Sequence, residues 1–318
     1  MGFALALLVG LVLALVAAAL AGALILNPRS APHLAGSGNV DPDTVSGFGR
    51  EWQKFTHGAE ALSERERADA FRSYFDIFPW HLIGRDGVGA DVGCGSGRWA
   101  VLVAPRVGRL LACDPSADAL SVARANLAGL GNVEFHQADA GSLPIADASL
   151  DFAYCLGVLH HIPDPARALC DIARKLKPGA PLLVYIYYAF DNRPRWYRLL
   201  WQASNGARLA IARLPYRLQV ATTASIALLV YWPLARAGAL LDRIGALPRG
   251  WPLAYYRHRS FYYMRTDSFD RFCTRLEHRF TRAAIERMLA QAGCGQIVFS
   301  SHEPFWCAAA IREPAGCS

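Results

Sequence analysis

The chain has 318 residues, of which 53% are hydrophobic and 19% charged, and its formal net charge is +7. This composition excludes an intrinsically disordered chain, and the length is sufficient for one large domain or two modest ones. The eight cysteines include no pair at Cys-x-x-Cys spacing, which argues against a zinc ribbon, a redox motif and a short disulfide framework, so we expect no metal site and a reducing compartment.

The N-terminal region has the pattern of a membrane anchor. From Phe3 to Leu26 there are 24 residues without a charge, which as a helix would be about 36 Å long, enough to cross a hydrocarbon core of roughly 30 Å. A cleaved signal peptide, the alternative, normally has Lys or Arg before a shorter apolar run, and none precedes this one. We therefore predict a transmembrane anchor over residues 1–28, followed by a linker and N-terminal cover over residues 29–62.

A glycine-rich turn follows the first strand of the predicted core. The apolar run Val88–Val92 predicts this strand, and Gly93, Gly95 and Gly97 follow it directly. Glycines let the backbone turn tightly and approach a ligand, and the helix that begins near Gly97 points its N-terminus at that ligand. Because Gly95, Gly97 and Ala100 also satisfy the dinucleotide fingerprint, the turn alone leaves NAD open.

Three carboxylates at strand ends favour a different cofactor. Asp91 ends the first strand, where it can pair with an ammonium group, which S-adenosylmethionine has and NAD lacks. Asp114 follows the second predicted strand, where its carboxylate can accept both ribose hydroxyls. Asp139 follows the third, where it can accept from an adenine amino group. Together these positions favour S-adenosylmethionine.

From about residue 90 to residue 186 the chain resembles a class I S-adenosylmethionine-dependent methyltransferase of the methyltransferase-11 type. The resemblance rests on four blocks in register, ADVGCGSG, CDPS, ADAGSLPIADASLDFAYCLGVLHHIPDP and KLKPGAPLLVYI. It implies that Asp91 and the loop residues Gly93, Gly95 and Gly97 hold the methionine part of the cofactor. It further implies that Asp114 holds the ribose, and Asp139 with Ala140 the adenine.

The alternation of strands and helices predicts an α/β fold. We expect a doubly wound, Rossmann-like, mostly parallel seven-stranded sheet with helices on both faces, and a cofactor site beyond the carboxyl ends of the strands. The core covers residues 63–190. A helix over residues 281–292 and strands over 297–300 and 305–311 complete the sheet in the C-terminal part, residues 263–318, so residues 191–262 are an insertion.

The insertion carries the basic excess of the chain. Residues 191–260 contain 11 Arg and 2 Asp, a local charge of +9, whereas the remaining 22 basic and 24 acidic residues give −2. Arginines interleaved with Trp and Tyr suit an anionic membrane surface, and the uncharged run 220–235 is short for a span. A membrane-surface element and a lid over the substrate both remain open, while nucleic acid is not an expected partner because no recognised module accompanies the arginines.

His160 and His161 follow the fourth strand and are the candidate general base for an oxygen or carbon acceptor. The strand reads Cys-Leu-Gly-Val rather than the Asn/Asp-Pro-Pro-aromatic pattern of many amino-group and nucleic-acid methyltransferases. We therefore expect a membrane-anchored enzyme with a cytoplasmic catalytic domain, acting on a small-molecule or lipid-linked acceptor, with residues 48–55 covering the cofactor. An NAD-dependent oxidoreductase and a non-catalytic, membrane-associated cofactor-binding protein are the alternatives.

Overall fold

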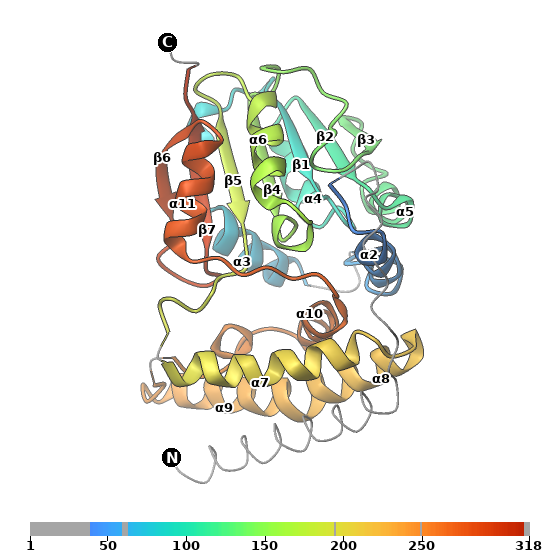
Figure 1. The fold of residues 1–318 in the computed structure, drawn as a ribbon, viewed down its shortest axis with the longest axis vertical. Helices are drawn as coiled ribbons and strands as arrows, with labels where there is room; N and C mark the ends of the chain where they lie inside the picture. The colour runs from blue at the N-terminus through green and yellow to red at the C-terminus, as the bar shows by residue number, and fades with distance from the viewer. Residues whose placement is uncertain (1–38, 59–62, 194, 249, 315–318) are drawn as a thin grey trace. The chain divides into compact units, whose positions relative to one another are not determined.

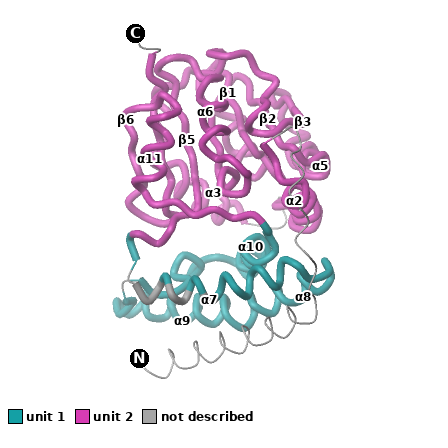
Figure 2. The backbone as a smooth tube through the Cα atoms, in the orientation of Figure 1, with its two compact units in different colours: residues 1–36, 192–275 teal, residues 37–191, 276–318 magenta. Residues whose placement is uncertain are grey.

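The computed structural model describes residues 39–58, 63–193, 195–248 and 250–314, and it divides the chain into two compact units. Within the described residues, the helical unit is Asn192–Arg275. The sheet unit consists of the described residues that precede and follow it in the sequence, 39–191 and 276–314 (Figure 2). The predicted anchor, residues 1–28, lies outside the described residues. The helical unit extends to Arg275, whereas the sequence placed the end of the insertion at residue 262.

The sheet unit contains one seven-stranded sheet in the order β3-β2-β1-β4-β5-β7-β6 (Figure 1). Strands β1 to β5 are parallel, and β7 runs antiparallel to both β5 and β6. This confirms the predicted Rossmann-like, mostly parallel sheet. The strands are β1 (Val88–Val92), β2 (Arg109–Asp114), β3 (Val133–Gln137), β4 (Phe152–Leu156), β5 (Pro181–Tyr185), β6 (Cys294–Phe299) and β7 (Cys307–Arg312).

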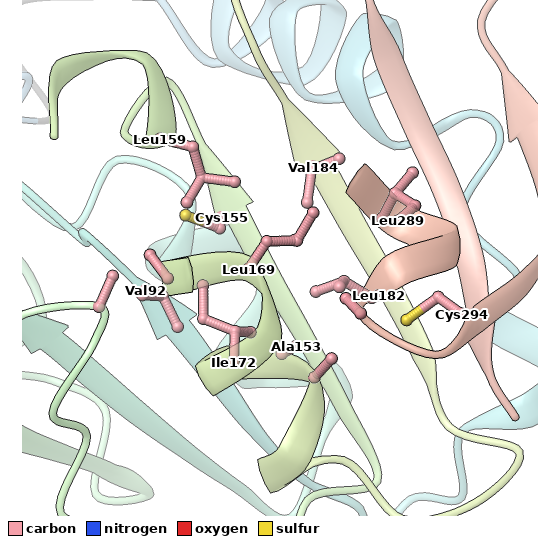
Figure 3. Packing of buried hydrophobic residues seen from close by; sticks show 14 of the residues in the cluster. Val92, Ala153, Cys155, Leu159, Leu169, Ile172, Leu182, Val184, Leu289 and Cys294 are labelled. Atoms are coloured by element: carbon pink, nitrogen blue, oxygen red, sulfur yellow. The ribbon is translucent and has the colours of Figure 1, made fainter. Parts of the chain in front are cut away.

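Helices cover both faces of the sheet. On one face lie α6 (Pro165–Lys175) and α11 (Arg282–Gln291), whose Leu169 and Leu289 join the apolar cluster shown in Figure 3. On the other face, the ring of Phe75 in α3 (Glu64–Phe75) lies 5.3 Å from that of Tyr154 in β4. The short α4 (Ala100–Val103) and α5 (Ala117–Asn126) follow β1 and β2. Strands buried on both sides need continuous apolar sequence, which β4 and β5 have.

A helix begins inside the stretch whose composition indicated a linker. Helix α2 covers Pro42–Lys54, and the carboxylate of its N-cap, Asp41, accepts a hydrogen bond from the Thr44 amide at 2.8 Å. Proline at the first helical position already has a suitable φ and lacks only an amide that the helix does not use there. Within residues 29–62, the stretch 29–47 is rich in Pro, Gly, Ser and Asp, which predicts a linker. That prediction is wrong from Pro42 onward, because a capped Asp-Pro start outweighs the polar composition.

The helical unit consists of α7 (Arg195–Ile211), α8 (Tyr216–Ile226), the π-turn η4 (Ala227–Tyr231), α9 (Trp232–Arg243) and α10 (Phe261–Cys273). Helices α8 and α9 run on through η4 as one helix of 28 residues, long and apolar enough by length and composition to cross a membrane. The Ser268 hydroxyl of α10 donates to the Thr223 carbonyl of α8 at 3.0 Å. Because α10 packs on α8 in this way, it belongs to the helical unit rather than to the C-terminal part.

Candidate active site

A cavity with about 730 Å³ of empty space, its open mouth included, lies at the carboxyl ends of β1 to β4. Its place is where open α/β sheets bind ligands. Helix α2 and the loops after the strands form its walls. The lining residues are Val40, Asp41, Thr44, Val45, Phe48, Trp52, Gly93, Asp114, Pro115, Ser116, Ala138, Asp139, Ala140, Leu156, Gly157, Val158, His161 and Ile162.

The glycine turn after β1 leaves no room for side chains. Gly93 has φ +77°, and a Cβ there would lie 2.2 Å from Cγ2 of Val158. Gly95 has φ +54°, and a Cβ there would lie 2.9 Å from Cε2 of Trp52. Glycine is thus required at both positions, by the left-handed backbone and by the close approach of neighbours.

Asp114, the last residue of β2, is fixed by two backbone amides. Its Oδ2 accepts from the Gly95 amide and its Oδ1 from the Ser116 amide, both at 2.9 Å. Burial raises the pKa of Asp114 to about 6, against the effect of these two hydrogen bonds. Each oxygen keeps a further lone pair, so the oriented carboxylate can accept from two hydroxyl groups of a ligand.

Asp91 is buried in β1, and no described residue hydrogen-bonds to its Oδ2. Burial raises its pKa to about 8, with the Tyr154 hydroxyl lowering it and Asp114 raising it further. A buried carboxylate oxygen that lacks a donor fits a positively charged donor such as an ammonium group. Asp91 itself is not among the residues that line the cavity, and neither are Gly95 and Gly97.

Asp139 and Ala140 follow β3 and line the cavity, as the sequence led us to expect. The carboxylate of Asp139 also holds its own loop: Oδ1 accepts from the Gly141 amide at 2.7 Å, and Oδ2 from the Ser142 hydroxyl at 2.5 Å. Asp139 is therefore both a turn residue and a candidate ligand residue. Of the predicted cofactor residues, Gly93, Asp114, Asp139 and Ala140 come together on the cavity wall.

Helix α2 contributes Thr44, Val45, Phe48 and Trp52 to the cavity wall. These residues lie within the predicted linker and cover, residues 29–62, and they begin before the segment 48–55 that we expected to lie over the cofactor. His57, just after α2, was not singled out. Its Nδ1 lies 3.4 Å from the Ser96 hydroxyl, and burial, with Arg98 adding to it, lowers its pKa to about 3. A lone histidine outside any motif offers no sequence signal for such a position.

The two candidate histidines occupy different environments within η3 (Leu159–His161). His160 is fully buried, its Nδ1 accepts from the Tyr187 amide at 3.3 Å, and its ring stacks on Tyr187 with centroids 3.7 Å apart. Burial first, then the neighbouring His161, holds the pKa of His160 well below its usual value. His160 is not among the residues that line the cavity.

His161 lines the cavity beside Phe48, with ring centroids 5.0 Å apart. Its Nδ1 lies 2.8 Å from the Leu276 carbonyl oxygen. A carbonyl oxygen only accepts, so this contact assigns the proton to Nδ1 and the lone pair to Nε2. Of the two histidines, only His161 combines a place at the cavity with a basic nitrogen.

Residues 90–184, which contain the glycine turn and all three strand-end carboxylates, match the family model described as a methyltransferase domain. Residues 90–184 are a class I S-adenosylmethionine-dependent methyltransferase domain. The cofactor of such a domain is S-adenosylmethionine, and the buried carboxylate oxygen of Asp91 that lacks a described hydrogen-bond donor fits its ammonium group.

Curated relatives of this methyltransferase domain include O-methyltransferases. The O-methyltransferase resE of Aspergillus sclerotiorum is 39% identical over 98 residues, which cover 30% of this chain and 37% of that protein. The ubiquinone biosynthesis O-methyltransferase of Paracidovorax citrulli is 29% identical over 187 residues, which cover 56% of this chain and 72% of that protein. The chain spans about two fifths of the length of the first curated relatives it matches, between 37% and 41%.

Among solved structures, the chain is similar to a chain of the Haloferax volcanii complex between the Trm112 methyltransferase activator and a methyltransferase. The two share 15% sequence identity and a TM-score of 0.50, over 86% of this chain and 99% of that one. At this identity the likeness shows a shared fold.

Proposed function

We propose that this protein transfers a methyl group from S-adenosylmethionine to a small-molecule or lipid-linked acceptor. The observation that carries the proposal is the cavity at the carboxyl edge of the sheet, within a matched methyltransferase domain, with Asp114 and Asp139 on its wall. These carboxylates end or follow adjacent strands, β2 and β3. Their spacing suits recognition of the ribose and the adenine of one nucleoside.

Each part of the cofactor then has a partner in this chain. Asp114 would accept the ribose hydroxyls, Asp139 with Ala140 would border the adenine, and the turn from Gly93 to Gly97 would pass under the methionine part. Asp91 would receive the ammonium group, which its unpaired, buried Oδ2 suits. When bound, the cofactor supplies a methyl group activated by attachment to a sulfonium.

We propose an oxygen acceptor, because relatives named O-methyltransferases favour it, and His161 as its general base. Nε2 of His161 would take the proton of the acceptor hydroxyl, so that the oxygen could accept the methyl group that the bound cofactor supplies. The Nδ1–H bond to the Leu276 carbonyl orients the ring and stabilises the imidazolium that forms. Phe48 and Trp52 on the cavity wall limit access of water.

We also propose that residues 3–26 anchor the protein in a membrane with its catalytic domain in the cytoplasm. The uncharged run of 24 residues supports the anchor. The cytosolic origin of the cofactor supports the orientation, as does the positive-inside tendency of Arg29 and the basic insertion. Alkaline carbonate extraction of membranes should leave the full chain in the pellet, and recovery in the supernatant would contradict an anchor.

Ligand-dependent thermal stability tests the cofactor assignment. The full chain should be stabilised by S-adenosylmethionine and S-adenosylhomocysteine but not by NAD, since a ligand stabilises only the state that binds it. Asp114→Ala should lose this stabilisation, whereas Asp86→Ala, at an exposed turn of the sheet unit, should keep it. Stabilisation by NAD alone would indicate an oxidoreductase.

A second candidate is a non-catalytic protein that only binds the cofactor, because the cofactor residues by themselves do not require turnover. Transfer of a labelled methyl group from S-adenosylmethionine to an extract of small molecules and lipids separates the two. Labelled product excludes the non-catalytic protein, and cofactor binding without any labelled product supports it.

A further inference from the structure

The helix that runs from Tyr216 to Arg243 has two faces of different character. Its buried residues recur every three or four positions, as one face of a helix requires. They are Thr223, Ile226, Ala227, Tyr231, Ala235 and Gly238. This face packs within the helical unit, where the hydroxyl of Ser268 donates to the Thr223 carbonyl.

The opposite face carries large apolar side chains that no described residue covers. Leu218, Leu228, Leu229, Trp232, Leu240 and Ile244 are 52%, 55%, 60%, 46%, 61% and 68% exposed. Of the ten exposed large hydrophobic side chains in the described part of the chain, eight belong to the helical unit. Single exposed leucines are ordinary, whereas a strip of this length marks an interaction surface.

The charges around the strip are of one sign. No charged residue occurs between 218 and 235, and Arg213, Arg217 and Arg243 are exposed near its ends. From Asn192 to Arg275 the sequence contains 14 Arg, 3 Asp and neither Lys nor Glu. The exposed Asp242 is neutralised by Arg257 at 3.0 Å and His258 at 3.2 Å.

We propose that this face of α8–α9, from Leu218 to Ile244, lies in the interfacial layer of an anionic lipid bilayer. Leucines and a tryptophan enter the acyl boundary while the flanking arginines reach the lipid phosphates, the arrangement of interfacial amphipathic helices. This rests on the helical unit alone and does not depend on the methyl acceptor.

The helix lies along the surface rather than across the bilayer. The chain enters the helical unit after β5 and leaves it before β7, and these two strands pair in one sheet, with Leu183 opposite Ala309. A single crossing would separate them by the width of the membrane. The buried face of α8, which packs on α10, would also have to leave its protein contacts to meet lipid.

Charge complementarity selects lipid over other occupants of the strip. A second copy of the chain would bring a unit with a formal charge of +11 against another of the same sign, which costs free energy. The uncharged residues 3–26 would offer the arginines no anionic partner. A surface of phosphate groups provides both an apolar layer and negative charge.

Photocrosslinking from the strip tests the assignment. The full chain would carry Leu229→p-benzoylphenylalanine or Leu240→p-benzoylphenylalanine, and the matched control would be Leu82→p-benzoylphenylalanine, an exposed apolar position in the sheet unit. Each protein is illuminated in bilayers of phosphatidylcholine with or without phosphatidylglycerol, and its adducts are identified by mass spectrometry. Because the replaced side chains are exposed, the variants should fold.

We expect phospholipid adducts at positions 229 and 240, at least severalfold above those at position 82, and a higher yield when phosphatidylglycerol is present. Arg213→Gln with Arg217→Gln should reduce that gain. Adducts to residues 1–38 would show that the chain covers its own strip, and adducts to a second copy would show a dimer. Either result, or no lipid adduct above the control, overturns the proposal, whatever the outcome for methyl transfer.

Discussion

Asp91 and Asp114 lie near the carboxyl ends of the neighbouring strands β1 and β2 and differ in what surrounds them. Asp114 has two backbone donors and a pKa raised to about 6, whereas Asp91 lacks a described donor on Oδ2 and has a pKa raised to about 8. At neutral pH the first is mostly ionised and the second mostly protonated. A cationic ligand group beside Asp91 would therefore bind its ionised form and displace its proton.

Cofactor binding should release nearly one proton at pH 7, because Asp91 is protonated below its pKa of about 8 and ionises beside an ammonium group. The affinity should rise about tenfold per pH unit up to that pKa. Calorimetric titration of S-adenosylmethionine in phosphate and in Tris measures the proton count. Asp91→Asn should remove the release. Identical heats in the two buffers for the parent protein would mean that Asp91 does not meet the ammonium.

His161→Gln should lower kcat for methyl transfer to a phenolic probe such as caffeate by about 100-fold or more, the usual effect of losing a general base. The affinity for S-adenosylmethionine should change little, and the dependence of the rate on pH should flatten. His81→Gln, at an exposed position, is the matched control. An unchanged rate in His161→Gln would remove the histidine from the mechanism.

At the scale of elements, α2 decides how the cavity is closed. It supplies four wall residues, and its Trp52 lies against the glycine turn. Helix α2 begins at a local sequence motif, the N-cap Asp41 followed by Pro42. The prediction of a linker rested on composition and did not use this motif. Because α2 forms part of the cavity wall, a change that destabilises α2 should also weaken ligand binding.

Asp41→Ala should weaken cofactor binding about fivefold, because loss of an N-cap costs a helix about 1 kcal/mol. Ser63→Ala removes the same kind of cap from α3, where the hydroxyl accepts from the Glu66 amide at 3.2 Å, and should leave affinity unchanged. The measurement is the Kd of S-adenosylhomocysteine for both variants and the parent. Equal losses in both variants would show a global rather than a local effect.

The bounds of β6 and the assignment of α10 differ from the sequence prediction because each depends on contacts with a segment distant in the sequence. The strand expected at residues 297–300 starts at Cys294, because β6 pairs with β7 as far as Arg312. Helix α10 joins the helical unit through contacts with α8, including that of Ser268 with Thr223, 45 residues apart in sequence. Neither pairing is visible in local periodicity.

At the scale of the whole molecule, the stability of the protein without cofactor should fall as pH rises from about 6.5 to 8. Asp91 holds its proton in the folded state up to a pKa of about 8 but loses it near 3.8 when unfolded. Stability is therefore lost as pH rises, by about 1.5 kcal/mol over this window. The buried His57 and His160 have lowered pKa values and are neutral in the folded state. In the unfolded state a histidine is about half protonated near pH 6.5, so these two side chains oppose part of the loss due to Asp91 at the lower end of this window.

Denaturant unfolding between pH 6.5 and 8 measures this slope. Asp91→Asn should remove most of it. His302→Asn is the comparison, because Asp76 and the Glu303 carbonyl raise the pKa of His302 at an exposed site and give a smaller slope of the same sign. A slope that persists in Asp91→Asn would place its origin elsewhere.

The sequence alone was sufficient to predict the cofactor class, the mostly parallel α/β sheet, and the placement of Gly93, Asp114, Asp139 and Ala140 at the carboxyl edge. These follow from short motifs attached to the ends of apolar strands, and parallel strands bring such ends together. Motifs at the ends of the strands are therefore sufficient to predict which of these residues meet at the carboxyl edge of the sheet.

The folded arrangement was needed to show that His161 rather than His160 lines the cavity and that the helical unit extends to Arg275. His160 and His161 are adjacent and both buried. They differ because the ring of His160 stacks on Tyr187 and does not line the cavity, whereas His161 lines it and contacts a carbonyl oxygen 115 residues away. The exposed strip of α8–α9 likewise became visible only once burial separated its two faces. Burial and long-range hydrogen bonds depend on which segments pack together, and this is a property of the folded chain rather than of neighbouring residues.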